Sequence, residues 1–136
     1  MAEKNFDVII IGGGPGGYVT AIRGAQLGLD VCIIEKEYLG GICLNWGCIP
    51  TKALLRSADI YHNMKNAEAF GLTAENVGFD LKKIIARSRS VSNQLSSGVS
   101  HLLKKNNVTV IDGEAKLEGP GRVLVSKGRK KDQHKE

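Results

Sequence analysis

Cysteine and histidine are scarce in this sequence, no long apolar stretch occurs, and each scarcity excludes a class of protein. Three cysteines among 136 residues cannot supply the two pairs of a Cys₄ zinc site. So few cysteines also fit a reducing cytosol better than a secreted, disulfide-stabilised protein. No apolar run reaches the roughly 20 residues of a membrane-spanning helix. The three histidines, His62, His101 and His134, are isolated, and we expect none of them to bind metal or act in catalysis.

The positive charge is concentrated at one end of the chain. The formal net charge is +5, and residues 127–136 hold five Lys or Arg against two acids, which is +3. The rest is nearly balanced, so a nucleic-acid surface is not expected. The length allows one domain, and 42% apolar residues are enough for a core. The first expected strand starts so close to Met1 that a signal or transit peptide has no room, and we expect a cytoplasmic protein.

A glycine-rich turn follows the first apolar run, residues 6–11. Residues 12–17 read Gly-Gly-Gly-Pro-Gly-Gly, which satisfies the pattern G-x-G-x-x-G. In that pattern Gly12 permits a tight turn, Gly14 lets the backbone approach a pyrophosphate, and Gly17 lets a helix pack close to the strand. The helix expected from Pro15 directs its free N–H groups at the same phosphates. Alone, the pattern is also compatible with an ordinary glycine turn.

An acidic residue stands where such a site needs one. Glu35 ends the second expected strand, 21 positions after Gly14, which is the distance at which an acid binds ribose hydroxyls. Strand, glycine turn, helix and acid together predict a dinucleotide site, although the acid does not separate NAD from FAD. Cys32, in the middle of the same strand, is expected to be a small core residue.

The other two cysteines lie five positions apart in the segment Gly40–Lys52. In an ideal helix their Cα atoms would be roughly 8–9 Å apart, from a rise of about 1.5 Å per residue. A disulfide requires about 4.4–6.8 Å. A bridge between Cys43 and Cys48 therefore needs a bent turn, which Gly47 makes easier. Because so small a loop stabilises a fold little, the pair is better interpreted as a redox disulfide than as a structural one.

The segment Gly40–Leu55 resembles the redox-active segment of the flavoprotein disulfide reductases. Within them it is most similar to the dihydrolipoyl dehydrogenases, because Leu and Asn follow Cys43 and Ile and Pro follow Cys48. Glutathione and mercuric reductases usually carry Val at those points. Ile42 stands where the family normally has Thr, so any hydroxyl contact to the cofactor is lost there.

The resemblance implies a complete chemistry. Dihydrolipoamide attacks a Cys43–Cys48 disulfide at Cys43, Cys48 lies nearer the flavin of FAD, and NAD⁺ accepts the electrons. It also places Lys52 beside the flavin ring and the backbone of Gly113 and Ala115 at the adenine. The positions expected to contact FAD are Gly12, Gly14, Pro15, Gly16, Glu35, Lys36, Gly40, Gly41, Cys43, Lys52, Gly113 and Ala115.

The remaining pattern predicts a Rossmann-like α/β fold. We expect strands near 6–11, 30–34 and 108–111 in one parallel sheet and a helix from Pro15 to Leu27. A second helix is expected to follow Cys43 and to run through Tyr61. Both cysteines would lie near its N-terminal end, where the helix dipole favours the thiolate form. Asp80 is expected to cap a helix to Lys105. Its apolar stripe would be Leu81, Ile84, Val91, Leu95, Val99 and Leu102, with Ser88 on the same stripe. Its solvated face would include Arg87, Arg89, Lys104 and Lys105. A last strand is expected over 122–125.

The resemblance covers residues 6–127, and 128–136 resemble nothing in the family. We therefore expect residues 1–127 to be the N-terminal part of an FAD domain, incomplete at its C-terminal end, followed by a charged tail. Family members are several times longer, form homodimers and serve the lipoyl domains of 2-oxo acid dehydrogenase complexes. The sequence leaves open whether the chain is truncated or ends naturally at Glu136. A glutathione or mercuric reductase and a non-catalytic nucleotide-binding module are the alternatives.

Overall fold

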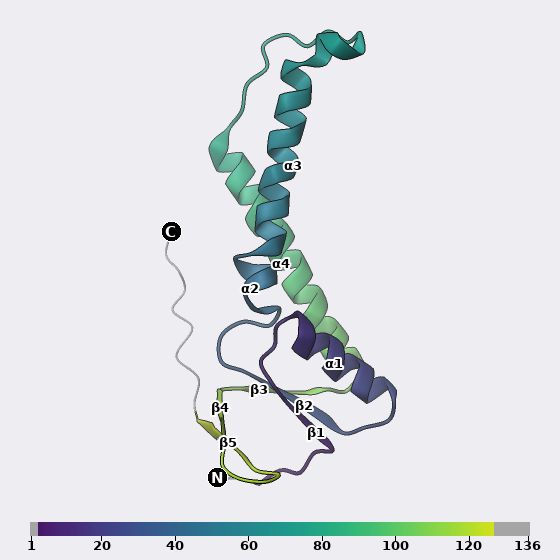
Figure 1. Cartoon of the computed structure of the whole chain (residues 1–136), viewed down its shortest axis with the longest axis vertical. Coiled ribbons are helices and arrows are strands. Elements are labelled where there is room, and N and C mark those ends of the chain that lie inside the picture. Colours follow the sequence, from purple (N-terminus) through teal and green to yellow (C-terminus); the bar gives the residue numbers. More distant parts are fainter. Residues whose placement is uncertain (1–2, 127–136) are drawn as a thin grey trace.

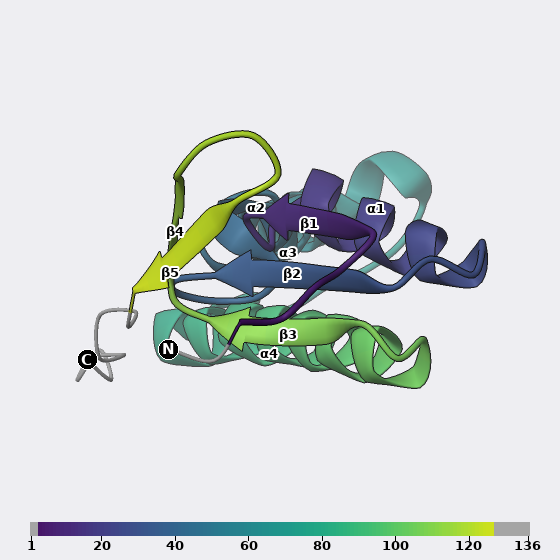
Figure 2. The ribbon, with the colours of Figure 1, turned by 90° about the horizontal axis from the view of Figure 1, so that it is seen from below.

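The protein forms a parallel sheet with its helices gathered on one side. The computed structural model describes residues 3–126. Strands β1 (Val8–Ile11), β2 (Val31–Glu35) and β3 (Thr109–Asp112) pair in parallel, with β2 in the centre. Their arrows run in one direction in Figure 2. The expected Rossmann-like sheet is confirmed, with strand ends that differ from the prediction by one or two residues.

The helices divide into a short one against the sheet and a long pair that projects away from it. Helix α1 (Pro15–Gln26) lies against β1 and β2. After α2 (Gly41–Asn45), helix α3 (Cys48–Lys65) extends away from the sheet to the short 3-10 helix η1 (Ala67–Phe70). Helix α4 (Leu81–Lys105) returns beside α3 to reach β3 (Figure 1). Its expected cap is confirmed, because the Asp80 carboxylate accepts the Lys83 N–H at 3.1 Å.

An antiparallel hairpin lies at the carboxyl ends of the parallel strands. It consists of β4 (Glu114–Leu117) and β5 (Val123–Ser126) (Figure 2). The sequence predicted the last strand, one residue early, but not its pairing. Gly113 lets the start of β4 lie close to the end of β5, because a Cβ at this position would lie 2.5 Å from the Ser126 carbonyl oxygen. The hairpin therefore forms one wall of the sheet's carboxyl edge, where ligands bind in folds of this class.

The core lies between the sheet and the helices, and Cys32 belongs to the buried residues, as predicted. The stripe predicted for α4 is confirmed in part, because its members Ser88 and Val99 are buried, whereas three of its leucines are exposed. Leu102 is 44% exposed while Leu103 is fully buried, and Leu81 and Leu95 are also exposed. The buried residues of α4 are Ser88, Ser92, Val99 and Leu103. Serines occupy two of these four buried positions, and the predicted stripe did not include Ser92 or Leu103.

Two arginines of the predicted solvated face also make hydrogen bonds to other helices, although Arg87 is exposed as expected and Arg89 is half-buried. Arg87 Nη1 donates to the carbonyl of Ala53 on α3 at 3.1 Å, and Arg89 Nη1 donates to the carbonyl of Asn45 on α2 at 2.9 Å. Both arginines therefore connect helices. Lys104 and Lys105 are exposed as expected, as are His62 and His101, whereas His134 and residues 128–136 lie outside the described residues.

Within residues 3–126, no helix combines the length and the apolar character that crossing a membrane requires.

The corrected helix face gives a direct test of stability. Leu103→Ala removes a fully buried side chain, and we expect it to lower the free energy of unfolding by about 2–5 kcal/mol. Leu102→Ala, the matched control one position earlier, should cost clearly less because Leu102 is already 44% exposed. Urea denaturation followed by circular dichroism measures both. A larger loss for Leu102→Ala would show that α4 packs with the face predicted from its apolar pattern.

Candidate functional site

The glycine turn between β1 and α1 leaves the start of α1 open. Gly12 has a φ of +99°, which favours glycine, and a Cβ on Gly17 would clash with the Gly12 carbonyl oxygen. Gly14 is the N-cap and Pro15 the first helical residue, and no side chain caps this end among the described residues. The N–H groups of Gly16 and Gly17 are thus available to an anion at the positive end of the helix.

Glu35 is attached to this turn by its carboxylate. One oxygen accepts the Gly13 N–H at 2.6 Å and the other accepts the Glu37 N–H at 2.8 Å. A carboxylate offers about four lone-pair sites, so each oxygen can still accept another hydrogen bond. The residue predicted to bind ribose therefore also fixes the glycine turn against the end of β2, a role that the sequence pattern did not indicate.

A cavity of about 200 Å³ opens at the carboxyl ends of the three parallel strands. Five of the residues predicted to bind the cofactor line it together, although they come from three separate parts of the chain. They are Gly12, Glu35, Lys36, Gly113 and Ala115, with Ile11, Ile34 and Glu114 as further lining residues. The prediction did not name these last three, of which Glu114 could have been found because it lies between two predicted residues.

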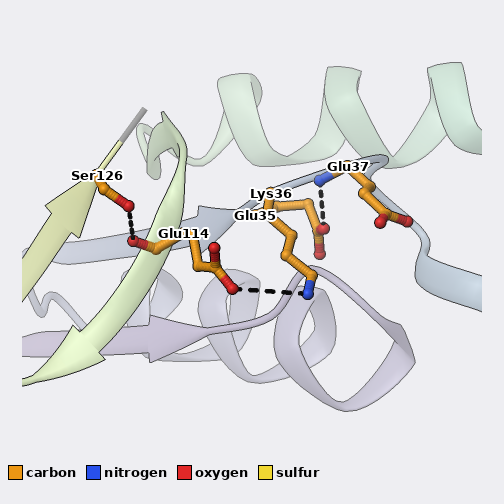
Figure 3. Close-up of polar contacts among 5 residues, drawn as sticks. All are labelled: Glu35, Lys36, Glu37, Glu114 and Ser126. Carbon is orange, nitrogen blue, oxygen red and sulfur yellow. Dashed lines mark hydrogen bonds and ion pairs between the residues drawn. The ribbon is translucent and has the colours of Figure 1, made fainter. Parts of the chain in front are cut away.

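Charged side chains meet across this cavity (Figure 3). Lys36 Nζ lies 3.9 Å from a carboxylate oxygen of Glu114 on β4, and both side chains are more than half exposed. The Glu114 carbonyl accepts a 3.4 Å hydrogen bond from the Ser126 hydroxyl, which connects β4 to β5. An exposed ion pair of this length contributes little to stability. It can therefore open without much cost when a ligand enters.

The second glycine pair packs directly on the first glycine turn. Gly40 donates its N–H to the Gly13 carbonyl at 2.8 Å, and its φ is +93°. A Cβ on Gly41 would lie 2.8 Å from the Cα of Gly14. The backbone of the cysteine segment thus lies against the backbone of the expected phosphate loop. The starts of α1 and α2 are side by side for this reason.

The two cysteines lie on either side of a break between helices. Cys43 is in α2, Cys48 is the first residue of α3, and Trp46–Gly47 separates them. The N–H groups of Trp46 and Gly47 both donate to the Ile42 carbonyl, at 2.8 and 2.7 Å, which closes a tight turn. The expected bend at Gly47 is confirmed. Both residues are free thiols here, so the disulfide stays a prediction.

The thiols interact with one another, and Cys43 responds to its neighbours. A hydrogen bond with the Cys48 side chain raises the pKa of Cys43, and desolvation and the charge of Cys48 act in the same direction. The Cys48 backbone and the positive charge of Lys52 oppose this rise. The expected position at the N-terminal end of the long helix is confirmed for Cys48, the first residue of α3, but not for Cys43. Cys43 lies in the five-residue α2 rather than at the start of the long α3.

The structure thus brings the predicted residues into two neighbouring groups. One lines the cavity, and the other consists of Cys43, Cys48 and Lys52. The glycine contacts join them. Lys52 is exposed and lies one turn after Cys48 on α3, as predicted. Within residues 3–126, no group of three or more His, Cys, Asp or Glu side chains could hold a metal ion.

A dinucleotide fits what this site offers. The uncapped start of α1 supplies N–H donors for phosphate, the Glu35 carboxylate supplies acceptors for hydroxyls, and the cavity provides space for a ring at the sheet edge. The adjacent thiol pair adds redox chemistry. The fold and the site together are those of a Rossmann-like protein whose expected dinucleotide site lies beside a pair of thiols.

Comparison with known proteins identifies the family. Residues 6–135 match the pyridine nucleotide-disulphide oxidoreductase family, and the chain belongs to it. A dihydrolipoyl dehydrogenase from Zymomonas mobilis subsp. mobilis is 62% identical over 125 residues, which are 92% of this chain and 27% of that protein. One from Rhizobium etli is 56% identical over 131 residues, 96% of this chain and 27% of that protein. The chain thus spans about a quarter of the length of these relatives.

A solved structure agrees with the fold. LpdA from Mycobacterium tuberculosis superposes with a TM-score of 0.74 at 27% identity, over 82% of this chain and 24% of that one. The family match extends beyond Lys127, where we expected the resemblance to end.

The opposing influences on Cys43 predict that two substitutions shift its pKa in opposite directions. Cys48→Ala removes the hydrogen bond and the charge that raise the pKa of Cys43, so this pKa should fall. Lys52→Gln removes a positive charge that lowers it, so the same pKa should rise. The measurement is the pH dependence of iodoacetamide alkylation at Cys43 under reducing conditions, resolved by peptide mass spectrometry. Shifts of the same sign in both variants would contradict the arrangement.

Proposed function

We propose that this chain forms the flavin-binding and redox-disulfide part of an enzyme that oxidises dihydrolipoamide to lipoamide. The observation that carries the proposal is the pair of interacting thiols beside an open glycine turn, with a cavity of about 200 Å³ at the neighbouring strand ends. The two relatives described above, each named dihydrolipoyl dehydrogenase, support the choice of substrate. In this proposal residues 1–127 belong to the FAD domain and 128–136 form a tail.

The residues around the cavity would hold the ADP half of FAD. The N–H groups of Gly16 and Gly17 face the position of a pyrophosphate, and Glu35 has lone pairs left for ribose hydroxyls. Gly113 and Ala115, from the edge of the hairpin, would lie against the adenine, with Lys36 at the mouth of the cavity. When bound, the flavin supplies a two-electron acceptor that can pass a hydride to NAD⁺.

The cysteines would perform the exchange with substrate. A thiolate of dihydrolipoamide attacks the Cys43 sulfur of the Cys43–Cys48 disulfide, and Cys48 leaves as a thiolate. The second substrate thiol, once deprotonated, attacks the substrate sulfur of this mixed disulfide, which forms lipoamide and releases Cys43 as a thiolate. One disulfide is broken and one formed, so two electrons move to the cysteine pair. The charge of Lys52 would stabilise negative charge at this point.

The rest of the reaction would use parts that correspond to the remaining three quarters of the relatives. The NAD⁺ site and the base that accepts the substrate protons would lie there, in a homodimer located in the cytoplasm. The partners would be lipoyl domains of 2-oxo acid dehydrogenase complexes.

A chimera tests the assignment of the cysteines. Residues 6–126 of this chain would replace the matching segment of the Zymomonas mobilis relative, to which the chain is 62% identical over 125 residues. We expect the chimera to oxidise dihydrolipoamide with NAD⁺, and both Cys43→Ser and Cys48→Ser to abolish turnover. Cys32→Ser is the matched control and should retain turnover, since Cys32 is a buried core residue. Turnover retained in either of the first two variants would refute the proposed redox pair.

A second test concerns Glu35 and FAD. In the same chimera, Glu35→Gln replaces one of two accepting oxygens by a donor that faces a backbone N–H. We expect the dissociation constant for FAD to rise about 5- to 140-fold, from roughly 1–3 kcal/mol for a disrupted buried hydrogen-bonding group. Glu37→Gln, two positions later and exposed, should leave it unchanged. Equilibrium dialysis measures both, and equal affinities for FAD in the two variants would exclude the proposed role.

A further inference from the structure

Asn45 connects the cysteine segment to helix α4 and to the residue just before the segment. Its side-chain amide donates to the Gly41 carbonyl at 2.8 Å and to the Leu39 carbonyl at 3.1 Å. Its side-chain oxygen accepts the Ser96 hydroxyl of α4 at 3.2 Å. Its backbone carbonyl accepts Arg89 Nη1, also from α4, at 2.9 Å. One residue therefore makes four hydrogen bonds, two of them to residues 44 and 51 positions away.

This residue lies between the two thiols. Asn45 is the last residue of α2, two positions after Cys43 and three before Cys48. The preceding Leu44 is buried in the main core. The end of α2 is thus fixed on one side by apolar burial and on the other by polar contacts with α4. The turn at Trp46–Gly47, which sets the direction of α3, begins directly at this fixed point.

We propose that Asn45, held by Ser96 and Arg89 of α4, is a positioning residue that sets the separation of the Cys43 and Cys48 sulfurs and thereby the stability of their disulfide. The inference deepens the proposed function, on which it rests for the role of the disulfide. Neither Asn45 nor Ser96 touches a sulfur in any described contact. They act by holding α2, which carries Cys43, against α4, on which α3 with Cys48 also packs.

The physical argument is one of effective concentration. A disulfide forms within the protein when a Cys43 or Cys48 thiolate attacks glutathione disulfide and releases one glutathione. The other cysteine then displaces the second glutathione from the mixed disulfide. Two electrons and two protons end on two glutathione molecules, and one S–S bond forms between Cys43 and Cys48. The equilibrium of the second step depends on how closely the fold holds the two sulfurs. A loose end of α2 lowers that effective concentration.

The test is the redox equilibrium of the complete 136-residue chain with glutathione, quenched by alkylation and read by peptide mass spectrometry. We expect Asn45→Ala to reduce the equilibrium constant for the Cys43–Cys48 disulfide about tenfold, which is about 30 mV for a two-electron couple. Asn106→Ala is the matched control. Asn106 makes the same 2.8 Å side-chain bond to a carbonyl four positions earlier, at the end of α4. It should leave the constant within about twofold.

Two milder variants at Ser96 keep the test decisive if the Asn45→Ala protein fails to fold. Ser96→Ala should reduce the constant about threefold, and Ser96→Thr, which keeps the hydroxyl, should restore it. Ser100→Ala removes a hydroxyl from the same helix whose 3.1 Å bond stays within α4, and should have no effect. An unchanged or increased constant in Asn45→Ala or Ser96→Ala, relative to its control, would overturn the proposal. An equal decrease of the equilibrium constant in each control variant would also overturn the proposal.

The measurement separates this inference from the proposed function. The equilibrium with glutathione needs no FAD, NAD⁺ or lipoamide. An inactive chimera would therefore count against the proposed function alone. A chimera that turns over, combined with an unchanged equilibrium in Asn45→Ala, would count against the positioning role alone.

Discussion

The contact on which the other features depend is the close approach of two stretches of glycine backbone. Gly40 donates to the Gly13 carbonyl, and Gly41 lies so close to Gly14 that a Cβ would reach its Cα at 2.8 Å. Any side chain at Gly41 would force the two loops apart. This contact brings the start of α1, where phosphate would bind, next to the start of α2, which carries Cys43. A cofactor and a thiol pair can share one site only if these loops touch.

Glu35 shows how a binding residue can be prepared for its ligand. Its carboxylate already accepts two backbone N–H groups, so its orientation is fixed before any ligand arrives. Bonds of N–H donors to a carboxylate are among the stronger hydrogen bonds in proteins. Binding then requires little further ordering of this side chain, which lowers the entropic cost of association. The bond from Gly13 also joins β2 to the glycine turn, so one residue serves both the expected binding and the local fold.

Much of the fold, and the parts of the site around the glycine turn and the cysteines, follow from local sequence patterns. The strand, glycine turn, helix and acid around Gly12–Glu35 each have a distinct local signature, and the two cysteines identify their own segment. The parallel sheet follows because long helical connections exclude hairpin pairing. The β4–β5 pairing and the wall that Glu114 adds to the cavity were not predictable in this way. The hairpin is local, but β4 reads Glu-Ala-Lys-Leu and lacks the β-branched and aromatic residues that are typical of a strand. The wall at Glu114 depends on segments far apart in the sequence, which leave no periodic signal.

Helix α4 shows the limit of pattern reasoning most clearly. The predicted stripe includes Ser88 and Val99, which are buried, but also Leu95 and Leu102, which are exposed. It omits Ser92 and Leu103, which are buried. The Ser92 hydroxyl is buried and has no hydrogen-bond partner among the described residues, which opposes stability. Small side chains nevertheless let neighbouring helices approach closely. The polar contacts of Arg89 and Ser96 with Asn45 then require a specific position of α2. Apolar packing alone would tolerate small displacements, whereas directional hydrogen bonds do not, and the thiol pair needs that precision.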